Sequence, residues 1–464
     1  MRVAVLNVVG LSPSVFARRK CPRLQAFAQR SGGIRTLTTD LPAVTCSVQA
    51  SMLTGRRTGE HGIVGNGWFD RDLQEVHFWK QSNRLVQVPL VWDTLRERAR
   101  AAGRPQPTVA NSFWWFNMGS GVDVAVTPRP QYRADGRKVP DCWTHPAGLR
   151  EELQRELGPF PLFRFWGPGA SIESTDWIAQ AAMRVEDRCQ PALQLVYLPH
   201  LDYCLQKFGP GDTRVDAEIR ELDRVFGVLE DFLCERGVHL VALSEYGIAP
   251  VDRAEFPNRL LREAGLLAVR DEDGRELLDP FESRAFAVCD HQVAHVYVRN
   301  AHDIEAARAV LTGIPGIGDV LDADAQRALG IHHARSGELL AVSAPGAWLA
   351  YPWWTDDARA PDYARTVDIH RKPGYDPLEL FMDPAIRAPS AYVAAQLAKR
   401  KLGFRALLET VPLDASLVKG SHGRMERGSP YAPVLLADGL DHLDAGPHPV
   451  TAVHDAMVHL VERT

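Results

Sequence analysis

A threonine, a glycine-rich stretch and an asparagine lie close together near the N-terminus, in a pattern that suits phosphate chemistry. Thr45, in PAVTCSVQASMLTG, stands just before a helical pattern and is followed by Cys46. The amides at a helix N-terminus favour an alkoxide and attract phosphate, so Thr45 is a candidate nucleophile, although an N-cap role would also place it there. The next segment, TGRRTGEHGIVGNGW, supplies Asn66, and its glycines let a ligand approach the backbone closely.

Polar side chains stand at or near the ends of three predicted strands. They are Asn7 in VLNVVGL, His200, Asp202 and Gln206 in LQLVYLPHLDYCLQKFGP, and Glu245 and Tyr246 in VHLVALSEYG. If these strands are parallel neighbours, the polar groups converge at one edge of the sheet, where such sheets bind ligands. A buried carboxylate is costly unless it is paired or binds a metal, so the convergent set predicts a functional site. For each residue taken alone, a solvated loop position is the alternative.

Three further segments carry histidines in polar surroundings. In GSHGR, His422 is flanked by glycines in a turn and is a candidate ligand or acid–base group. DHQVAH contributes His291 and His295, which would point to the same side of a strand, and VDIHRKPGYDP contributes His370. Structural or surface roles stay open for these last three histidines.

Strand-like and helical patterns alternate along the chain and must position these residues. Short β-branched runs occur at 3–9, 193–198, 238–243, 293–298 and 339–342, and helical patterns at 90–100, 147–156, 175–187, 215–233, 389–402 and 451–462. This alternation predicts an α/β fold with a mostly parallel sheet sandwiched between helices. Residues 111–145, rich in Trp, Phe and Pro, are expected to form a long ordered loop. Residues 255–345 are expected to form a smaller α+β cap insertion, which leaves 1–254 and 346–464 as the core.

The composition excludes several classes of protein. The 464 residues are 45% hydrophobic and 24% charged, which excludes disorder or coiled coil as a description of the whole chain. A net charge of −5 does not favour binding to a nucleic-acid polymer. The seven cysteines form no CxxC, and no apolar run approaches the membrane-spanning length of about 18 residues. We therefore expect a cytoplasmic protein with no membrane and no nucleic-acid polymer as a partner, in an oligomeric state that the sequence leaves open.

The segment PAVTCSVQASMLTG followed by TGEHGIVGN resembles the type I phosphodiesterase / nucleotide pyrophosphatase branch of the alkaline phosphatase superfamily. Later elements come in the order of that family: a strand ending in Asp, a strand ending in S-[DE]-x-G, and a final GxHG. The resemblance covers residues 1–66, 193–250 and 415–425, and its first block is the most specific part.

The resemblance implies an alkaline phosphatase-like core and chemistry with two divalent metals, usually zinc. A threonine attacks phosphorus and forms a phospho-enzyme ester, which is then hydrolysed. One metal would be bound by Asn7, Thr45, Glu245 and Tyr246, and the other by Asp202, Gln206 and His422. Asn66 and the backbone amide of Cys46 would hold a phosphoryl oxygen.

Four of these positions depart from the types that the family uses. Asn7 stands where an Asp is expected, unless the register places Val9 there; Gln206 replaces a His, and Glu245 and Tyr246 replace an Asp-His pair. Amide oxygens and tyrosine are poor zinc ligands. A single ion held by Asp202, His422 and Glu245 is one possibility, with Mn or Mg favoured by the oxygens. Replacement ligands from elsewhere are another, namely His200, His291, His370 or Asp376.

We expect a metal-dependent hydrolase of phosphodiester or pyrophosphate bonds in a small-molecule phosphate ester. A phosphonate (C–P) hydrolase of the same superfamily is one alternative, and a non-catalytic pseudoenzyme that binds phosphorylated ligands is the other. The expected pocket lies between the sheet edge, the cap and an aromatic stretch that could equally be core, Trp114, Trp115 and Phe116. Arg371, Lys372 and Lys419 are candidates for phosphate contact, with solvated surface as the alternative for each.

Overall fold

The computed structural model describes residues 1–134, 137–425, 428–440, 443 and 446–463. Within these residues the largest sheet has nine strands in the order β23-β2-β22-β11-β1-β10-β5-β6-β9. Its strands are β1 (Val3–Val8), β2 (Arg35–Thr38), β5 (Val109–Ser112), β6 (Val124–Pro128), β9 (Cys142–His145), β10 (Leu193–Leu198), β11 (His239–Leu243), β22 (Val434–Ala437) and β23 (His448–Pro449).

The centre of the sheet is parallel, as predicted. β1 pairs in parallel with β10 on one side and with β11 on the other, so Asn7 lies opposite both Tyr197 and Leu243. Every residue of β1 and β10 is buried, which is what continuous apolar runs predict for strands covered on both faces. The carboxyl ends of these three strands therefore lie side by side at one edge.

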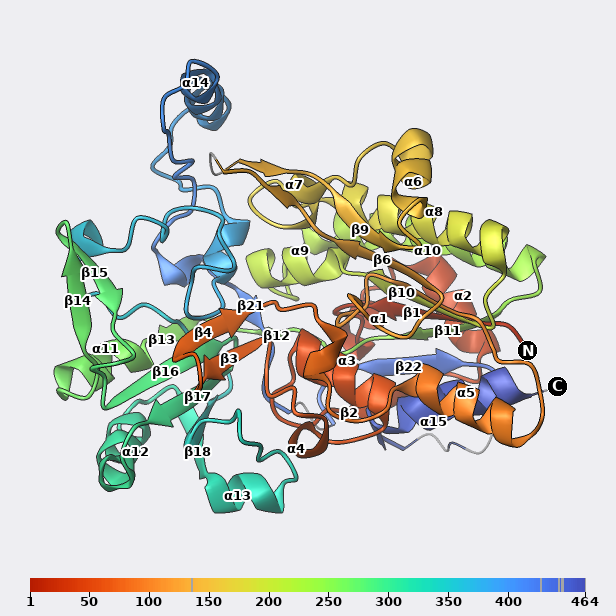
Figure 1. Ribbon diagram of the computed structural model, residues 1–464, viewed down its shortest axis with the longest axis horizontal. Helices are drawn as coiled ribbons and strands as arrows, with labels where there is room; N and C mark the ends of the chain where they lie inside the picture. Colours follow the sequence, from red (N-terminus) through yellow and green to blue (C-terminus); the bar gives the residue numbers. More distant parts are fainter. Residues whose placement is uncertain (135–136, 426–427, 441–442, 444–445, 464) are drawn as a thin grey trace.

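Helices cover both faces of this sheet (Figure 1). α8 (Ile172–Cys189), α9 (His200–Phe208) and α10 (Val215–Glu235) lie on one face, and α3 (Thr45–Thr54), α5 (Val91–Ala101) and α15 (Ala452–Glu462) lie on the other. The other helices of the core are α1 (Pro13–Ala17), α2 (Pro22–Arg30), α4 (Thr58–His61), α6 (Leu149–Leu157) and α7 (Leu162–Phe165). α10 buries an apolar stripe at helical spacing that includes Ile219, Leu222 and Phe226. The predicted helical segments are confirmed, and so is an α/β core of the expected kind.

One predicted element is wrong. Residues 111–145 are not a loop, because they contain β6, the small hairpin of β7 (Gln131–Tyr132) and β8 (Lys138–Val139), and β9. β6 pairs in parallel with β5 and antiparallel with β9, which extends the central sheet to its edge. These strands are short and their sequence is broken by Pro and polar residues, so they lack the long apolar runs of the sheet centre. Trp114 and Phe116 are core residues, with 0% and 1% of their surface exposed.

A second sheet forms from residues in the middle of the chain. Its order is β16 (Ala285–Asp290), β17 (Val293–Val298), β19 (Leu339–Ser343) and β18 (Ile317–Asp322), and all its pairs are antiparallel. Helices α11 (Pro257–Glu263), α12 (Ile304–Thr312) and α13 (Ala323–Ala328) accompany it, with a hairpin of β14 (Val269–Glu272) and β15 (Arg275–Leu278). β13 (Arg253–Glu255) pairs with β20 (Ala347–Leu349) where the chain enters and leaves this unit.

Smaller elements complete the architecture. β3 (Gly67–Asp70) and β4 (Glu75–Phe78) form a hairpin directly after Asn66, and β12 (Ala249–Pro250) pairs with β21 (Gly420–Ser421). The remaining helix, α14 (Pro389–Lys401), stands away from the rest of the molecule in Figure 1. Short 3-10 turns cover Asn83–Leu85, Ala301–Asp303, Asp357–Arg359, Pro377–Leu380 and Ala415–Leu417.

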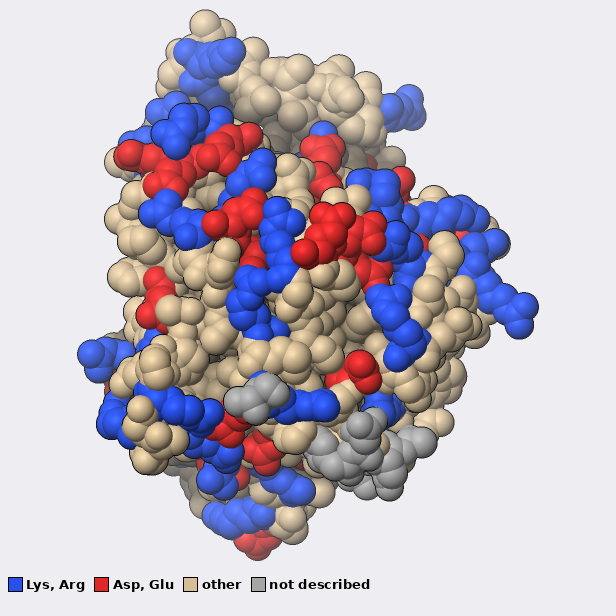
Figure 2. All heavy atoms as spheres, turned by 90° about the vertical axis from the view of Figure 1, so that its right-hand side faces the viewer, with Lys and Arg blue, Asp and Glu red and all other residues tan. Residues whose placement is uncertain are grey.

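The surface shows no strong bias of charge on the face that carries both chain ends. Figure 2 shows Lys and Arg interspersed with Asp and Glu across that face. A search of the described residues finds no helix with the length and apolar character needed to span a bilayer.

Candidate active site

Thr45 is the first residue of α3 and lies at the edge of the sheet where β1, β10 and β11 end. Only 5% of its surface is exposed. The N-cap of α3 is Val44, with an extended backbone, so the alternative N-cap role for Thr45 is wrong. Its hydroxyl is therefore free for other partners.

A chain of hydrogen bonds connects Thr45 with a buried carboxylate. Thr45 Oγ1 lies 3.0 Å from the hydroxyl of Tyr246, which donates to Asp202 Oδ1 at 3.2 Å. Because Tyr246 has a single proton and gives it to Asp202, it accepts from Thr45. Gln206 Nε2 donates to the other oxygen of Asp202 at 2.7 Å, one turn further along α9. Burial raises the pKa of Asp202 to about 7.

Glu245 holds a second group of side chains together. Asn7 Nδ2 and Gln49 Nε2 both donate to Glu245 Oε2 at 2.6 Å. Burial raises the pKa of Glu245 to about 8. Gln49 was not among the predicted site residues, although it follows Thr45 by four positions on α3 and therefore lies on the same helix face.

His422 reaches the centre from the turn after β21 with one ring nitrogen free. Its Nδ1 lies 2.8 Å from the carbonyl oxygen of Ala43, while its Nε2 is buried without a hydrogen-bond partner and lies 3.9 Å from Asp202 Oδ1. The contact with Ala43 assigns the proton to Nδ1, which leaves a lone pair on Nε2. Burial lowers the pKa of His422 to about 3, so the ring stays neutral at physiological pH.

Three further rings line up beside this histidine. The ring of His422 lies 3.5 Å from that of Tyr246 and 3.7 Å from that of His291, and His291 lies 3.6 Å from Tyr375. The Tyr375 hydroxyl donates to Gln206 Oε1 at 2.9 Å. Tyr375 was not predicted as a site residue. It belongs to VDIHRKPGYDP, where the prediction singled out charged residues and His370.

The two groups expected to bind phosphate, the Cys46 amide and Asn66, lie side by side, and an unexpected carboxylate contacts Asn66. Cys46 N donates to Asn66 Oδ1 at 2.9 Å, as the proximity of the two motifs predicts. The backbone N and side-chain Nδ2 of Asn66 both donate to Asp290, at 2.8 and 3.0 Å. Sequence reasoning missed Asp290 because it considered only the two histidines of DHQVAH.

The centre has an unusual charge balance. Asp202, Glu245 and Asp290 are all buried, and burial raises the pKa of Asp290 to about 7 as well. Among the residues that the structure describes, none of these three carboxyl groups forms an ion pair with Lys or Arg. Buried carboxylates without such partners are the kind of group that binds metal ions.

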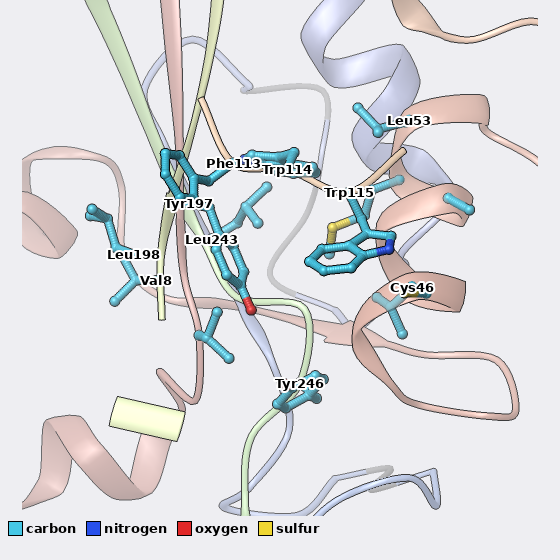
Figure 3. Close-up of a cluster of buried hydrophobic side chains, with 14 of the residues drawn as sticks. Val8, Cys46, Leu53, Phe113, Trp114, Trp115, Tyr197, Leu198, Leu243 and Tyr246 are labelled. Carbon is cyan, nitrogen blue, oxygen red and sulfur yellow. The ribbon is translucent and has the colours of Figure 1, made fainter. Parts of the chain in front are cut away.

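Aromatic side chains surround the same space. Figure 3 shows Tyr197 and Tyr246 coming from the strand ends, with Trp115 beside the first turn of α3 and next to Cys46. Trp115 N donates to Gln49 Oε1 at 2.7 Å, which fixes the side chain that bonds Glu245. Trp115 therefore supports the site from the core.

Several predicted residues lie elsewhere. His200 Nε2 bonds Glu218 at 2.8 Å, and His370 Nδ1 lies 3.2 Å from the carbonyl oxygen of Phe78, so neither turns toward Thr45. Three more of the predicted residues bind other partners. Asp376 pairs with Lys372 at 2.6 Å, and Arg371 pairs with Asp362. Lys419 donates to the carbonyl oxygen of Ser416.

The prediction that the two histidines of DHQVAH point to the same side of a strand is wrong. His295 is in β17 and bonds the carbonyl oxygen of Val64 at 2.9 Å, whereas His291 lies in the turn before β17 with φ of 60°. That turn is what carries His291 to His422.

The residues at the centre depart from the two-zinc site that the resemblance implies. His422 Nε2, Glu245 Oε1 and Asn7 Oδ1 are buried and have no hydrogen-bond partner. Gln206 and Tyr246, by contrast, stand where imidazoles are expected and are bonded to Asp202. As the side chains stand, no three His, Cys, Asp or Glu residues in the described part of the chain could hold an ion together. Binding one would require the bonds to Asp202 or Glu245 to open.

The fold is shared with proteins of known structure. Phosphonoacetate hydrolase from Sinorhizobium meliloti 1021 superposes with a TM-score of 0.61 at 15% identity, covering 99% of this chain and 96% of that one. Human ectonucleotide pyrophosphatase / phosphodiesterase 5 superposes with a TM-score of 0.58 at 14% identity, covering 100% and 96%. The first was solved in complex with phosphonoformate, and the murine counterpart of the second with AMP. At these identities the likeness shows a common fold.

Sequence comparison is more specific. An uncharacterized pyrophosphatase/phosphodiesterase of Schizosaccharomyces pombe is 26% identical over 263 residues, which make up 56% of this chain and 46% of that protein. The chain thus spans about half the length of this relative. The family profile described as Type I phosphodiesterase / nucleotide pyrophosphatase matches residues 3–376, a range that includes Thr45, Asn66 and Asp202. The chain therefore belongs to the type I phosphodiesterase / nucleotide pyrophosphatase family.

Proposed function

We propose that this protein hydrolyses phosphodiester or pyrophosphate bonds in small molecules, with Thr45 as its nucleophile. The observation that carries the proposal is the hydrogen-bond chain from Thr45 Oγ1 through Tyr246 to Asp202, with distances of 3.0 and 3.2 Å. It gives a buried hydroxyl at a helix N-terminus a route by which to lose its proton. Membership of the family supports the class of reaction.

The first half of the reaction transfers a phosphoryl group to the enzyme. Thr45 Oγ1 attacks phosphorus while the bond from phosphorus to the leaving oxygen breaks. The proton of Thr45 passes to the Tyr246 oxygen as the Tyr246 proton passes to Asp202. The leaving oxygen then takes up the proton from Asp202.

The second half regenerates Thr45. A water molecule attacks the phosphorus of the Thr45 ester, and the bond between phosphorus and Oγ1 breaks. One proton of that water returns to Oγ1 along the same hydrogen bonds, and its oxygen stays on the released phosphate. The Cys46 amide and Asn66 would bind a phosphoryl oxygen in both halves, for which Asn66 Oδ1 must leave the Cys46 amide.

A divalent ion is part of the proposal. Asp202, Glu245 and His422 would hold it. Members of the family are typically metal-dependent. Zinc is expected from the resemblance, and Mn²⁺ or Mg²⁺ from the predominance of oxygen ligands. When bound, the ion supplies the positive charge that this acidic centre lacks, next to the phosphoryl oxygens.

The proposal also assigns roles to larger parts of the chain. Residues 255–345 would act as a cap over a core of residues 1–254 and 346–464, which is supported by the contacts of Asp290 with Asn66 and of His291 with His422. A cytoplasmic location is supported by the seven cysteines, all within the described residues, which are free thiols.

The test is hydrolysis of bis-p-nitrophenyl phosphate and of p-nitrophenyl phosphate by metal-stripped protein, with Zn²⁺, Mn²⁺ or Mg²⁺ added back. We expect metal-restored cleavage of the diester that falls by at least about a thousandfold in Thr45→Ala. Thr54→Ala is the matched control, since Thr54 is in the same helix, is equally buried at 5% exposure and bonds Ala50 O. Its activity should equal that of the wild type.

Two other outcomes would replace the proposal. Cleavage of phosphonoacetate without cleavage of the diester would identify a phosphonate hydrolase. Absence of turnover with every metal, together with binding of AMP, would identify a ligand-binding protein. Activity that survives Thr45→Ala would show that another group is the nucleophile.

A further inference from the structure

A segment near the C-terminus leaves the body of the molecule and returns to the same place. Its two ends are joined where Asp383 N donates to Thr410 O at 2.7 Å, and Arg365 contacts both sides, through Asp383 Oδ2 at 3.4 Å and Val411 N at 2.9 Å. Between these ends lies α14. We call residues 384–408 the arm, and none of them is buried. Figure 1 shows α14 standing clear of both sheets.

The arm combines exposed apolar residues with positive charge. Its exposed apolar residues are Leu397 (47%), Leu402 (76%), Phe404 (65%) and Leu407 (48%), four of the eleven large hydrophobic residues exposed in the described part of the chain. Its five basic residues are Arg387, Lys399, Arg400, Lys401 and Arg405, and it contains no Asp or Glu. The chain as a whole has a net charge of −5, so the arm opposes the general balance.

A left-handed glycine and two hydrogen bonds order the tip of the arm. Gly403 adopts a left-handed backbone with φ of 86°, which ends α14 and turns the chain back. Phe404 N then bonds Lys399 O at 3.1 Å, and the Arg400 side chain bonds Ala406 O at 2.7 Å. Leu402 and Phe404 lie in this turn and are 76% and 65% exposed, and Lys399, Lys401 and Arg405 are close to them in the sequence. The exposed apolar surface is therefore presented by the fold.

We propose that the arm docks on the surface of a membrane that contains anionic lipids. Apolar side chains that enter the headgroup region, flanked by Lys and Arg that meet anionic headgroups, are the combination that binds proteins to such surfaces. A symmetric contact of this arm with the arm of a second copy would bring five more positive charges against these five. A nucleic acid would satisfy the charges and leave three leucines exposed to water.

The expectation that no membrane is a partner rested on the absence of a spanning segment. Docking at the surface needs no such segment, because only the tip enters the headgroup layer. The arm follows the loop that carries Tyr375 into the active site. The inference does not depend on the proposed hydrolysis.

The test is flotation of the full-length protein with vesicles of phosphatidylcholine alone and of phosphatidylcholine with phosphatidylglycerol. We expect binding to the anionic vesicles only, and loss of that binding at high salt, as the screening of surface charge requires. The triple variant Lys399→Gln/Lys401→Gln/Arg405→Gln should bind about a hundredfold less tightly, since each basic residue near an anionic surface contributes roughly fivefold.

The apolar part is tested by Leu402→Ser/Phe404→Ser, which should also abolish flotation. Phe281→Ser is its control, because Phe281 is 55% exposed and lies outside the arm. Arg98→Gln/Arg100→Gln/Arg104→Gln, on and just after α5, is the control for charge. Both controls should bind like the wild type. Every one of these variants should hydrolyse a soluble diester as the wild type does, which separates this result from the proposed function.

A deletion keeps the test decisive if a substitution disturbs the arm. Because Asp383 and Thr410 are already hydrogen-bonded, a short Gly-Ser linker can replace residues 385–408 without opening the body of the protein. The deletion variant should melt at the wild-type temperature and lose vesicle binding. Wild-type protein that fails to float with anionic vesicles, or a deletion variant that still floats, would overturn the proposal. So would an arm that binds RNA or mediates self-association in place of lipid.

Discussion

Tyr246 is the residue that most changes the chemistry of this centre relative to what the family resemblance implies. Its hydroxyl contacts both Thr45 and Asp202, so one phenol joins the nucleophile to the base. We predict that Tyr246→Phe lowers kcat for the diester by about a hundredfold to a thousandfold, with little change in KM, because the route for the proton is removed.

The control for that prediction is Tyr203→Phe. Tyr203 is buried to the same degree, at 7% exposure against 3% for Tyr246, and its ring packs against Trp166. An unchanged or raised kcat in Tyr246→Phe would mean that the phenol does not carry the proton.

The negative charge of Asp290 opposes the binding of an anion at Asn66 and the Cys46 amide. Its carboxylate takes the two N–H donors of Asn66, which turns Asn66 Oδ1 toward the Cys46 amide. A phosphoryl group must compete with this arrangement, and a dianion is repelled about twice as strongly as a monoanion. We predict that Asp290→Asn improves the affinity for inorganic phosphate by roughly tenfold and that for dimethyl phosphate by less.

Isothermal titration at pH 8.5 measures both affinities, without any need for turnover. Asp223→Asn is the matched control, because Asp223 is also 4% exposed and also accepts two N–H groups, those of Arg23 and Leu24. Equal gains for the two ligands, or no gain in a folded variant, would contradict a role for Asp290 in selection by charge.

At the scale of elements, the sequence predicts the interior better than the edges. β1 and β10 are fully buried, and their continuous apolar runs identify them without further information. β9 at the edge of the sheet and β6 beside it are shorter than β1 and β10, and the sequence predicts a loop for both. The same reason explains why Thr45 and Asn66 could be predicted: they lie 21 residues apart in one dense motif, and the local pattern carries the information.

The rest of the site could not be predicted, because it is made by contacts between distant segments. Asp290 and Asn66 are 224 residues apart in the chain, and Tyr375 and Gln206 are 169 apart. The local pattern of the sequence does not indicate contacts between such distant residues. The loop that carries Tyr375 is fixed by Lys372, which is buried and bonds Asp376 and Glu379 at 2.6 and 2.8 Å. That lysine had been expected at the phosphate, and its function is to hold the loop in place.

At the scale of the whole molecule, two buried histidines contact residues 62–66, which end in Asn66 and which we call the phosphate segment. His61 accepts from Ile63 N and bonds Ser51, and His295, from the second sheet, bonds Val64 O. Burial lowers the pKa of His61 to about 3 and that of His295 to about 4. Both rings are therefore neutral in the native protein at pH 5, where the unfolded chain binds a proton at each.

These two histidines lower the free energy of unfolding as the pH falls. Because the unfolded state binds more protons below about pH 6.5, the contribution of each histidine to stability is complete above that pH. As the pH falls from about 6.5 toward 4, each histidine costs roughly 1.4 kcal/mol of unfolding free energy per pH unit. Asp202 and Glu245, whose pKa values are raised, act in the opposite direction over part of this range. The histidine contribution is therefore measured as a difference between variants.

We predict that urea unfolding shows a smaller loss of stability between pH 7.5 and pH 5 in His295→Gln than in the wild type, by roughly 2 kcal/mol at most. Glutamine can donate to Val64 O as the imidazole does, yet it takes up no proton. His302→Gln is the control, because the His302 side chain is 76% exposed and makes no contact with Val64. If the wild type and His295→Gln lose stability in parallel, then His295 is protonated in the native state and the contact between the second sheet and Val64 survives acid. If they diverge as predicted, acid weakens the attachment of the second sheet to the phosphate segment, since Asp290 and His295 belong to that same sheet.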